Sequence, residues 1–265
     1  MGGDVLTPLL DLPGVAAAAT GARDAVDALL WDRAVRSRQA DVGAESALRG
    51  PWANAWFEGA QCGLAELRSG SAVDGSPIGR LLAGSLALAA DVPSLVGVIG
   101  TSPAQALARM HAVAARGFSP EPDLGRPRQG PFAEDALRVG QPPGPGDVAQ
   151  RLAGVGSLLR QSRAPGVLVA AVVHAEVAAV RPFSWGSGMV ARALLRLVLA
   201  QRGVDPGMLG APEVGLRALG RPQYVRGLRG YIAGTPDGVA EFLVMVCGAV
   251  RSGAQDARTW EAVTR

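Results

Sequence analysis

The amino-acid sequence predicts an all-α fold with one irregular arm. Most of the chain consists of apolar stretches with the spacing of helices. Nowhere do short strands alternate with helices in the way that a parallel sheet requires. One segment, residues 118–146, contains seven prolines and several glycines, a density that no helix tolerates. We therefore expect a helical domain from which this arm departs.

Apolar spacing assigns the individual helices. Residues 22–39, for example, place Val26, Leu29 and Val35 among charged residues, as an amphipathic helix does. Asp147 is suited to be the N-cap of a helix, and the proline-free stretch that follows it predicts a second helix. The expected helices are residues 22–39, 52–67, 78–90, 103–115, 147–161, 167–180, 189–201, 213–217, 223–231 and 238–251.

The chain length of 265 residues suits one large domain or two small ones, and no internal repeat divides it. Residues 1–20 are rich in glycine, proline and alanine, and we treat them as a variable N-terminus. Residues 21–265 are expected to form a single helical domain. Its core should cover about residues 76–252, with the helices of residues 22–70 packed on it.

Composition excludes several classes of function. All 26 basic residues are arginine, so the chain offers no lysine for a Schiff base or a P-loop. The net charge is only +3 and the arginines are scattered, so nucleic-acid binding is not indicated. Two histidines exclude a His-rich metal site, and His174 is expected to be a core residue. Cys62 and Cys247 are expected to fill the core.

Nothing in the sequence indicates a membrane partner. The N-terminus lacks the basic region and apolar run of a signal peptide. Residues 167–180 are apolar but shorter than the ~20 residues that a span needs. We therefore expect a cytoplasmic protein.

The most informative stretch joins two apolar runs, residues 167–180 and 189–201, through a tight turn. Pro182 should end the first helix, because it disfavours helical geometry in the residue before it. Gly186 and Gly188 should allow positive φ angles. Such a turn directs free N–H groups and the positive end of the helix dipole to one place. That place suits an anion, and above all a phosphate.

The turn also resembles the HPFxxGNGRxxR signature of the Fic (Fido) family. It reads Arg181-Pro182-Phe183-Ser184-Trp185-Gly186-Ser187-Gly188-Met189-Val190-Ala191-Arg192. Five of the eight fixed positions match: Pro182, Phe183, Gly186, Gly188 and Arg192. Arg181, Ser187 and Met189 replace the family's His, Asn and first Arg. The resemblance implies a degenerate Fic-type helical bundle, and the alanine and glycine bias indicates GC-rich bacterial coding.

In the family, the signature histidine is the general base that helps to transfer AMP from ATP to a hydroxyl of a target protein. Arg181 cannot act as that base, because its pKa is above about 12. Ser184, at the place given to an acidic Mg²⁺ ligand, is a poor ligand for that ion. Ser187 and Met189 lack the phosphate-binding groups of Asn and Arg. The resemblance therefore implies no ordinary AMP transfer, no bound metal and no clear need for Mg²⁺.

An anion site remains after these losses. Its expected residues are Arg181, Ser184, Gly186, Ser187, Gly188 and Arg192, and its expected ligand is ATP, another nucleotide or another anion. Three alternatives stay open. The protein could be a transferase of altered chemistry, in which Arg181 stabilises a phosphoryl charge and an arm residue is the base. It could be a protein-interaction module that uses the arm and Trp185. Or the turn could merely connect two helices, with Arg181 and Arg192 paired to Glu176 or another acid.

The resemblance assigns two further segments. Many Fic proteins carry an inhibitory helix with a Ser-x-x-x-Glu-Gly/Asn pattern, whose glutamate pairs with a signature arginine and blocks the γ-phosphate. Residues 44–50 are similar in outline, with Arg49 in place of the glutamate and Met189 in place of its partner. Both halves of the ion pair would then be missing; the alternative is an ordinary helix that Pro51 ends. Residues 118–146 would be a flap with a short β-hairpin that positions a protein target, or else an irregular connector.

Overall fold

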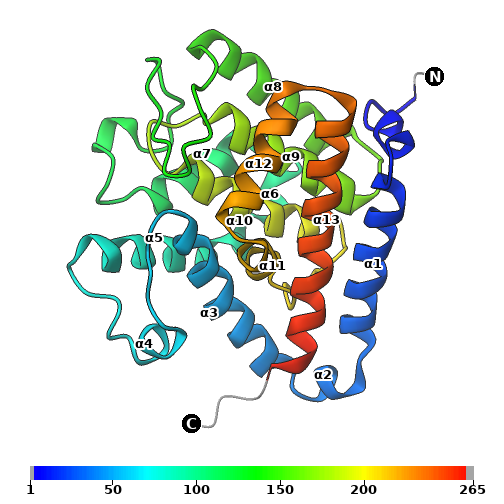
Figure 1. Cartoon of the computed structure of the whole chain (residues 1–265). Helices are drawn as coiled ribbons and strands as arrows, with labels where there is room; N and C mark the ends of the chain where they lie inside the picture. The colour runs from blue at the N-terminus through cyan, green and yellow to red at the C-terminus, as the bar shows by residue number, and fades with distance from the viewer. Residues whose placement is uncertain (1–2, 261–265) are drawn as a thin grey trace.

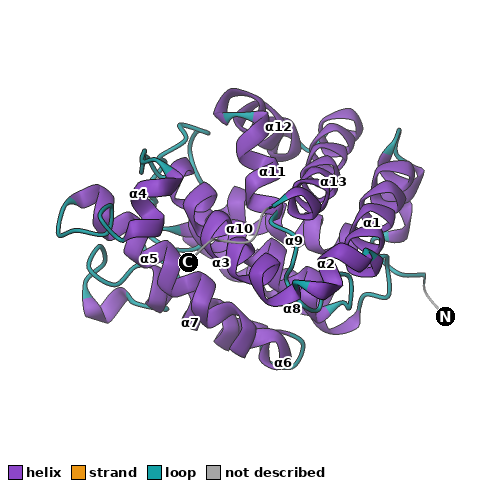
Figure 2. Cartoon of the chain, turned by 90° about the horizontal axis from the view of Figure 1, so that it is seen from below, coloured by secondary structure: helices purple, strands orange, loops and turns teal. Residues whose placement is uncertain are grey.

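The protein's structure is a computed structural model that describes residues 3–260. Over that range it contains α-helices and three short 3-10 helices but no strand, and a lone bridge pairs Arg116 with Ser119 (Figure 2). The all-α prediction is confirmed. The expected hairpin in the arm does not form within the described residues.

The helices follow one another around a central pair (Figure 1). The first part of the chain contains η1 (Thr7–Asp11), α1 (Val15–Trp31), α2 (Arg33–Ser37), α3 (Gln39–Phe57) and α4 (Leu64–Ser69). The next part contains α5 (Pro77–Asp91), η2 (Val92–Leu95), α6 (Val96–Ile99), α7 (Pro103–Ala114) and η3 (Glu121–Asp123). The last part contains α8 (Pro145–Gln161), α9 (Gly166–Val180), α10 (Ser187–Gln201), α11 (Pro212–Leu219), α12 (Arg221–Ala233) and α13 (Pro236–Thr259).

Helices α9 and α10 form the centre of the domain. Nearly every residue of both is buried, because α9 is apolar on all its faces and its neighbours surround it. Helices α1, α8, α12 and α13 pack on α9, while α3, α6 and α7 pack on α10. The loop between α9 and α10 is therefore fixed by a rigid, close-packed core on both sides.

The N-terminal helix packs along the C-terminal one. Figure 1 shows α1 and α13 side by side and running in the same direction, and their ends are tied together. The Arg258 guanidinium pairs with the Asp32 carboxylate at 2.8 Å, and Arg38 Nη2 donates to the Arg258 carbonyl at 3.1 Å. Residues 7–20, expected to be variable, already contain η1 and the first turns of α1.

Helix α3 corrects the expected bounds near the N-terminus. The predicted helices 22–39 and 52–67 are wrong, because α1 ends at Trp31 and α3 continues through Pro51 as far as Phe57. Pro51 does not end the helix; its carbonyl accepts a hydrogen bond from Ser85 Oγ at 2.8 Å. The break at Asp32 has a local cause, since its side chain caps α2 by accepting from the N–H groups of Ala34 and Val35.

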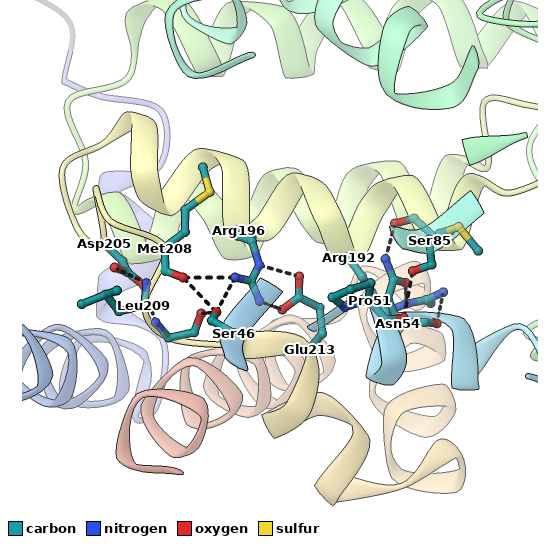
Figure 3. A network of polar contacts seen from close by, with 12 residues as sticks. Ser46, Pro51, Asn54, Ser85, Arg192, Arg196, Asp205, Met208, Leu209 and Glu213 are labelled. Atoms are coloured by element: carbon teal, nitrogen blue, oxygen red, sulfur yellow. Dashed lines mark hydrogen bonds and ion pairs between the residues drawn. The ribbon is translucent and has the colours of Figure 1, made fainter. Parts of the chain in front are cut away.

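A buried polar network fixes the segment 44–50 that was assigned to a relict inhibitory helix (Figure 3). Arg196 binds the Glu213 carboxylate through two hydrogen bonds of 3.0 and 2.8 Å, and its Nη1 donates to Ser46 Oγ at 2.7 Å. A Cβ added at Gly50 would lie 2.3 Å from Arg196 Nη2. Gly50 is small because it packs against this guanidinium, so the segment is part of the core of the fold.

The stretch Pro77–Ile99 contains α5, η2 and α6. It is 23 residues long with a mean hydropathy of 1.8, so by length and composition it could cross a membrane. In this fold Leu82, Leu88, Leu95 and Ile99 are buried. Helix α5 packs on α3 and α7, and α6 packs on α7 and α10. One third (33%) of the most apolar part of this stretch is buried within the domain.

Candidate functional site

The loop between α9 and α10 is built by two residues in the left-handed region. Arg181 ends α9 with a φ of 46°, and Gly186 precedes α10 with a φ of 73°. Ser187 closes the loop, because its Oγ accepts from the Phe183 N–H at 3.0 Å and donates to the Phe183 carbonyl at 3.1 Å. The first N–H groups of α10 have no partner within the helix, which leaves them free to bind a ligand.

Gly188 differs from the expectation, since its φ is not positive. It is needed for a close approach: an added Cβ would lie 2.9 Å from Glu58 Oε1 and 3.2 Å from Arg192 Nη1. The glycine thus lets a carboxylate and a guanidinium reach the start of α10.

A small cavity lies between this loop, the arm, the end of α3 and α12. Its volume is about 30 Å³. Most of the expected site residues line it together: Arg181, Gly186, Ser187, Gly188 and Arg192. Ser184 does not line the cavity. Three acidic residues that the sequence analysis did not select also line it: Glu58, Glu134 and Asp135.

Arg192 is fully buried at the base of this cavity. Its Nε donates to Asn54 Oδ1 at 2.6 Å, its Nη2 forms an ion pair with Glu58, and its guanidinium lies 4.7 Å from the ring centre of Phe57. Nη1 has no hydrogen-bond partner among the described residues. A buried guanidinium nitrogen without an acceptor is costly, and an anion in the cavity would satisfy it.

The ion pair between Glu58 and Arg192 corrects the interpretation of the inhibitory segment. We expected both halves of that pair to be missing, with Arg49 at the glutamate position. A glutamate that pairs with a signature arginine lies at the end of α3, within the sequence Asn54-Ala55-Trp56-Phe57-Glu58-Gly59. This stretch fits the Ser-x-x-x-Glu-Gly outline with Asn54 in place of the serine. The spacing was visible in the sequence, but we expected a helix to continue past it to residue 67.

Arg181 is also buried, and it contacts the arm. Its Nη1 lies 3.1 Å from Asp135 Oδ2, and its Nη2 donates to the Gly140 carbonyl. Its own carbonyl accepts from Arg128 Nε at 2.8 Å. Both arginines of the loop are therefore paired with acids, although neither is paired with Glu176. That carboxylate binds Arg151 and Tyr231 elsewhere.

Glu134 is exposed as a residue but lines the cavity. Its backbone N–H donates to the Ser184 carbonyl at 2.8 Å, which aligns the arm with the loop. Desolvation and the nearby carboxylate of Glu58 raise the pKa of Glu134 to about 7, against the opposing effect of the Gly186 N–H. This side chain can therefore hold or release a proton near neutral pH.

The two histidines are engaged in packing and in hydrogen bonds. His174 is fully buried; its Nδ1 donates to the Ala191 carbonyl at 2.9 Å, so its Nε2 accepts from the Tyr224 hydroxyl at 3.0 Å. Desolvation lowers the pKa of His174 to about 4. His111 stacks on Phe183 with ring centres 3.9 Å apart, and its Nδ1 accepts from the Gly125 N–H. The core assignment of His174 is confirmed.

Two of the three carboxylates that line the cavity are not free to bind Mg²⁺. The carboxylates of Glu58 and Asp135 are bound to arginines, and no group of three or more His, Cys, Asp or Glu residues within 3–260 could hold a metal ion. Trp185, the other candidate for ligand contact, stacks on Phe118 of the arm with ring centres 4.2 Å apart.

No protein family model matches this chain, and no match was found among curated proteins. Solved structures do match. A Fic family protein from Desulfovibrio desulfuricans G20 is 21% identical with a TM-score of 0.74, over 93% of this chain and 74% of that one. Fic-1 from C. elegans (residues 134–508) is 18% identical with a TM-score of 0.68, over 95% and 74%.

The chain has the Fic fold. A glutamate-to-glycine variant of the same C. elegans protein also matches, with a TM-score of 0.64 and 18% identity. Sequence identities this low establish the architecture and leave the activity to be argued from the site.

Proposed function

We propose that this Fic-fold protein binds the phosphates of a nucleotide, or another anion, at residues 181–192 without His-dependent AMP transfer. One observation carries the proposal: the unpartnered Nη1 of the buried Arg192 lines the same cavity as the start of α10. Helix α10 has 15 residues, so its N-terminus supplies a favourable dipole and free N–H groups. Together they suit one phosphate-sized negative group.

The absence of AMP transfer follows from Arg181. The side chain at this position carries a permanent charge and pairs with Asp135, so it cannot accept a proton from a hydroxyl. His174 has both ring nitrogens engaged in the core. Removing a general base typically lowers the rate by ~10²–10⁴.

Glu58 would compete with the ligand. Its carboxylate binds the guanidinium of Arg192, the group that we assign to the phosphate. Glu58 therefore takes the inhibitory role that the resemblance gives to a glutamate. A ligand has to displace this carboxylate or bind beside it on Nη1.

Calorimetric titration with ATP, ADP and AMP, with and without Mg²⁺, tests the proposal. We expect heat with the wild type at millimolar ligand or below, and about tenfold tighter binding by Glu58→Gln, which removes the competing charge. Arg192→Lys keeps the charge but loses the planar fork, so it should weaken binding by about tenfold. The exposed Arg251→Lys is the matched control. An absence of heat with both wild type and Glu58→Gln would contradict the proposal.

A second function is favoured by Glu134. A carboxylate with a pKa of about 7 beside the loop is suited to general-base chemistry, so a transferase that uses an arm residue in place of the histidine is the alternative. Labelled ATP incubated with cell lysate should then yield a modified protein with the wild type and none with Glu134→Gln. A product that persists in Glu134→Gln would remove Glu134 from this role.

A protein partner bound through the arm is a third candidate. Phe132 is 70% exposed on the arm. A pull-down with wild type and Phe132→Ser should lose the partner if the arm docks it, and identical partners from both would count against this candidate. Trp185 stacks on Phe118 of the arm and would form part of the same surface.

A further inference from the structure

The arm is fastened to the loop by contacts that centre on two arginines. The Arg128 side chain donates to the carbonyls of Arg181, Val180, Gly130 and Pro143. The backbone N–H groups of Arg128 and Glu134 donate to the carbonyls of Pro182 and Ser184, both at 2.8 Å. The Arg181 side chain, in return, holds Asp135 and the Gly140 carbonyl.

Asp135 also shapes the part of the arm that Arg181 holds. Its carboxylate oxygens accept from the N–H groups of Val139 and Gly140, both at 2.9 Å. The ion pair with Arg181 thus connects the turn of the arm to the end of α9. The negative group that faces Arg181 is supplied by the protein itself.

The cavity is too small for a nucleotide unless one of the segments that line it moves. Sites for small ligands typically enclose about 300–1,000 Å³, whereas this cavity holds about 30 Å³. Helices α9 and α10 are close-packed and cannot retreat without breaking the core. The arm is held by polar contacts and by apolar contacts of the buried Ala133 and the half-buried Leu137 and Val139, and most of residues 129–140 are exposed or half-buried. The arm is therefore the lining segment that can be displaced with the smallest loss of free energy.

We propose that residues 126–140 form a lid over the anion site, that the ion pair of Arg181 with Asp135 latches it, and that a bound anion releases it by taking Arg181 from Asp135. This inference rests on the proposed function, because it describes how that site opens. Arg181, at the position of the signature histidine, would then have two functions. It holds the site shut in the absence of a ligand and binds the ligand when the lid opens.

Amide hydrogen exchange of the Arg128 and Glu134 backbone reports the lid directly. Both N–H groups are bound to loop carbonyls when the lid is shut, and neither touches the Asp135 side chain. We expect their exchange to become faster when the wild type is saturated with ATP. Calorimetry on the same samples measures binding independently of the lid.

Asp135→Asn removes the negative charge from the ion pair with Arg181 and nearly keeps the shape of the side chain. We expect faster exchange at Arg128 and Glu134 without ligand, and about tenfold tighter ATP binding, because less of the binding energy is used to open the lid. Arg128→Gln should loosen the same amides while leaving the Arg181 side chain unchanged. Glu121→Gln, an exposed acid in η3, is the matched control and should behave as the wild type.

The outcomes separate the inference from the proposed function. ATP binding with unchanged or slower exchange at Glu134 would overturn the lid and leave the anion site standing. Binding by Asp135→Asn that is no tighter than that of Glu121→Gln would overturn the latch. An absence of binding by wild type, Asp135→Asn and Glu58→Gln alike would overturn both.

Discussion

Two arginine–carboxylate pairs on the central helices show how differently the same chemistry is used. Arg196 of α10 and Glu213 of α11 form two hydrogen bonds in the core, with side-chain exposures of 8% and 4%. Arg181 of the loop forms an ion pair with Asp135 of the arm through a single carboxylate oxygen, Oδ2, and the Asp135 side chain is 24% exposed. The first pair joins two elements of the rigid core, whereas the second joins the core to an irregular segment. Burial and geometry, more than residue type, separate a fixed pair from a releasable one.

Breaking the core pair should have the largest effect. Arg196→Met leaves Glu213 as a buried charge without a partner, so we expect a loss of about 3–5 kcal/mol in the free energy of unfolding. Urea denaturation followed by circular dichroism measures it. In the double variant Arg196→Met with Glu213→Leu most of the loss should be recovered. A loss below 1 kcal/mol in the single variant would contradict the contrast between the two ion pairs.

Acid should weaken the core more than the arm, through His174. Desolvation lowers its folded-state pKa to about 4, below the value of 6.5 of an unperturbed histidine. The unfolded state therefore takes up the proton first, and the contribution to stability present above about pH 6.5 is lost as the pH falls towards 4. At pH 5 the expected loss is about 2 kcal/mol relative to pH 7.5. The urea midpoint should depend less on pH in His174→Asn; an equal dependence would exclude His174 as the cause.

Breaking the arm pair should cost little stability. Asp135→Asn removes a single partly exposed ion-pair contact, so we expect less than about 1 kcal/mol in the free energy of unfolding. The same urea titration that detects Arg196→Met provides the comparison. A loss as large as that of the core pair would mean that the arm belongs to the cooperative core.

The smallest expected effect concerns the pH dependence of anion binding. The cavity is faced by Glu58, Asp135, Arg181 and Arg192 as well as by Glu134, whose raised pKa is about 7. Protonation of Glu134 removes a negative charge from the cavity. Sulfate should therefore bind about threefold more tightly at pH 6 than at pH 8. Calorimetry with sulfate avoids the titration of a phosphate ligand.

Glu134→Gln should flatten the pH profile of sulfate binding, and an unchanged profile would assign the effect to another group.

The raised pKa of Glu134 also affects the stability of the fold. Because the folded-state pKa lies above the ordinary glutamate pKa of 4.5, the contribution of Glu134 to stability is present below about pH 4.5 and is lost as the pH rises through about 7.

The sequence predicted the elements whose cause is local. The central helices, expected at 167–180 and 189–201, lie at Gly166–Val180 and Ser187–Gln201, because Pro182 and Gly186 mark their ends. Around Pro51 the prediction failed, since tertiary packing against α5 and α11 keeps the helix continuous there. The glycines and arginines that line the cavity were selected from the signature. Their partners Glu58 and Asp135 are distant in sequence, and spacing within the loop contains no information about them.

The pairing of α1 with α13 sets an order of events during synthesis. The apolar face of α1, which includes Val26 and Leu29, is buried against a helix that leaves the ribosome more than two hundred residues later. A nascent chain that lacks α13 therefore leaves this face uncovered. Synthesis of α13 completes the burial of α1.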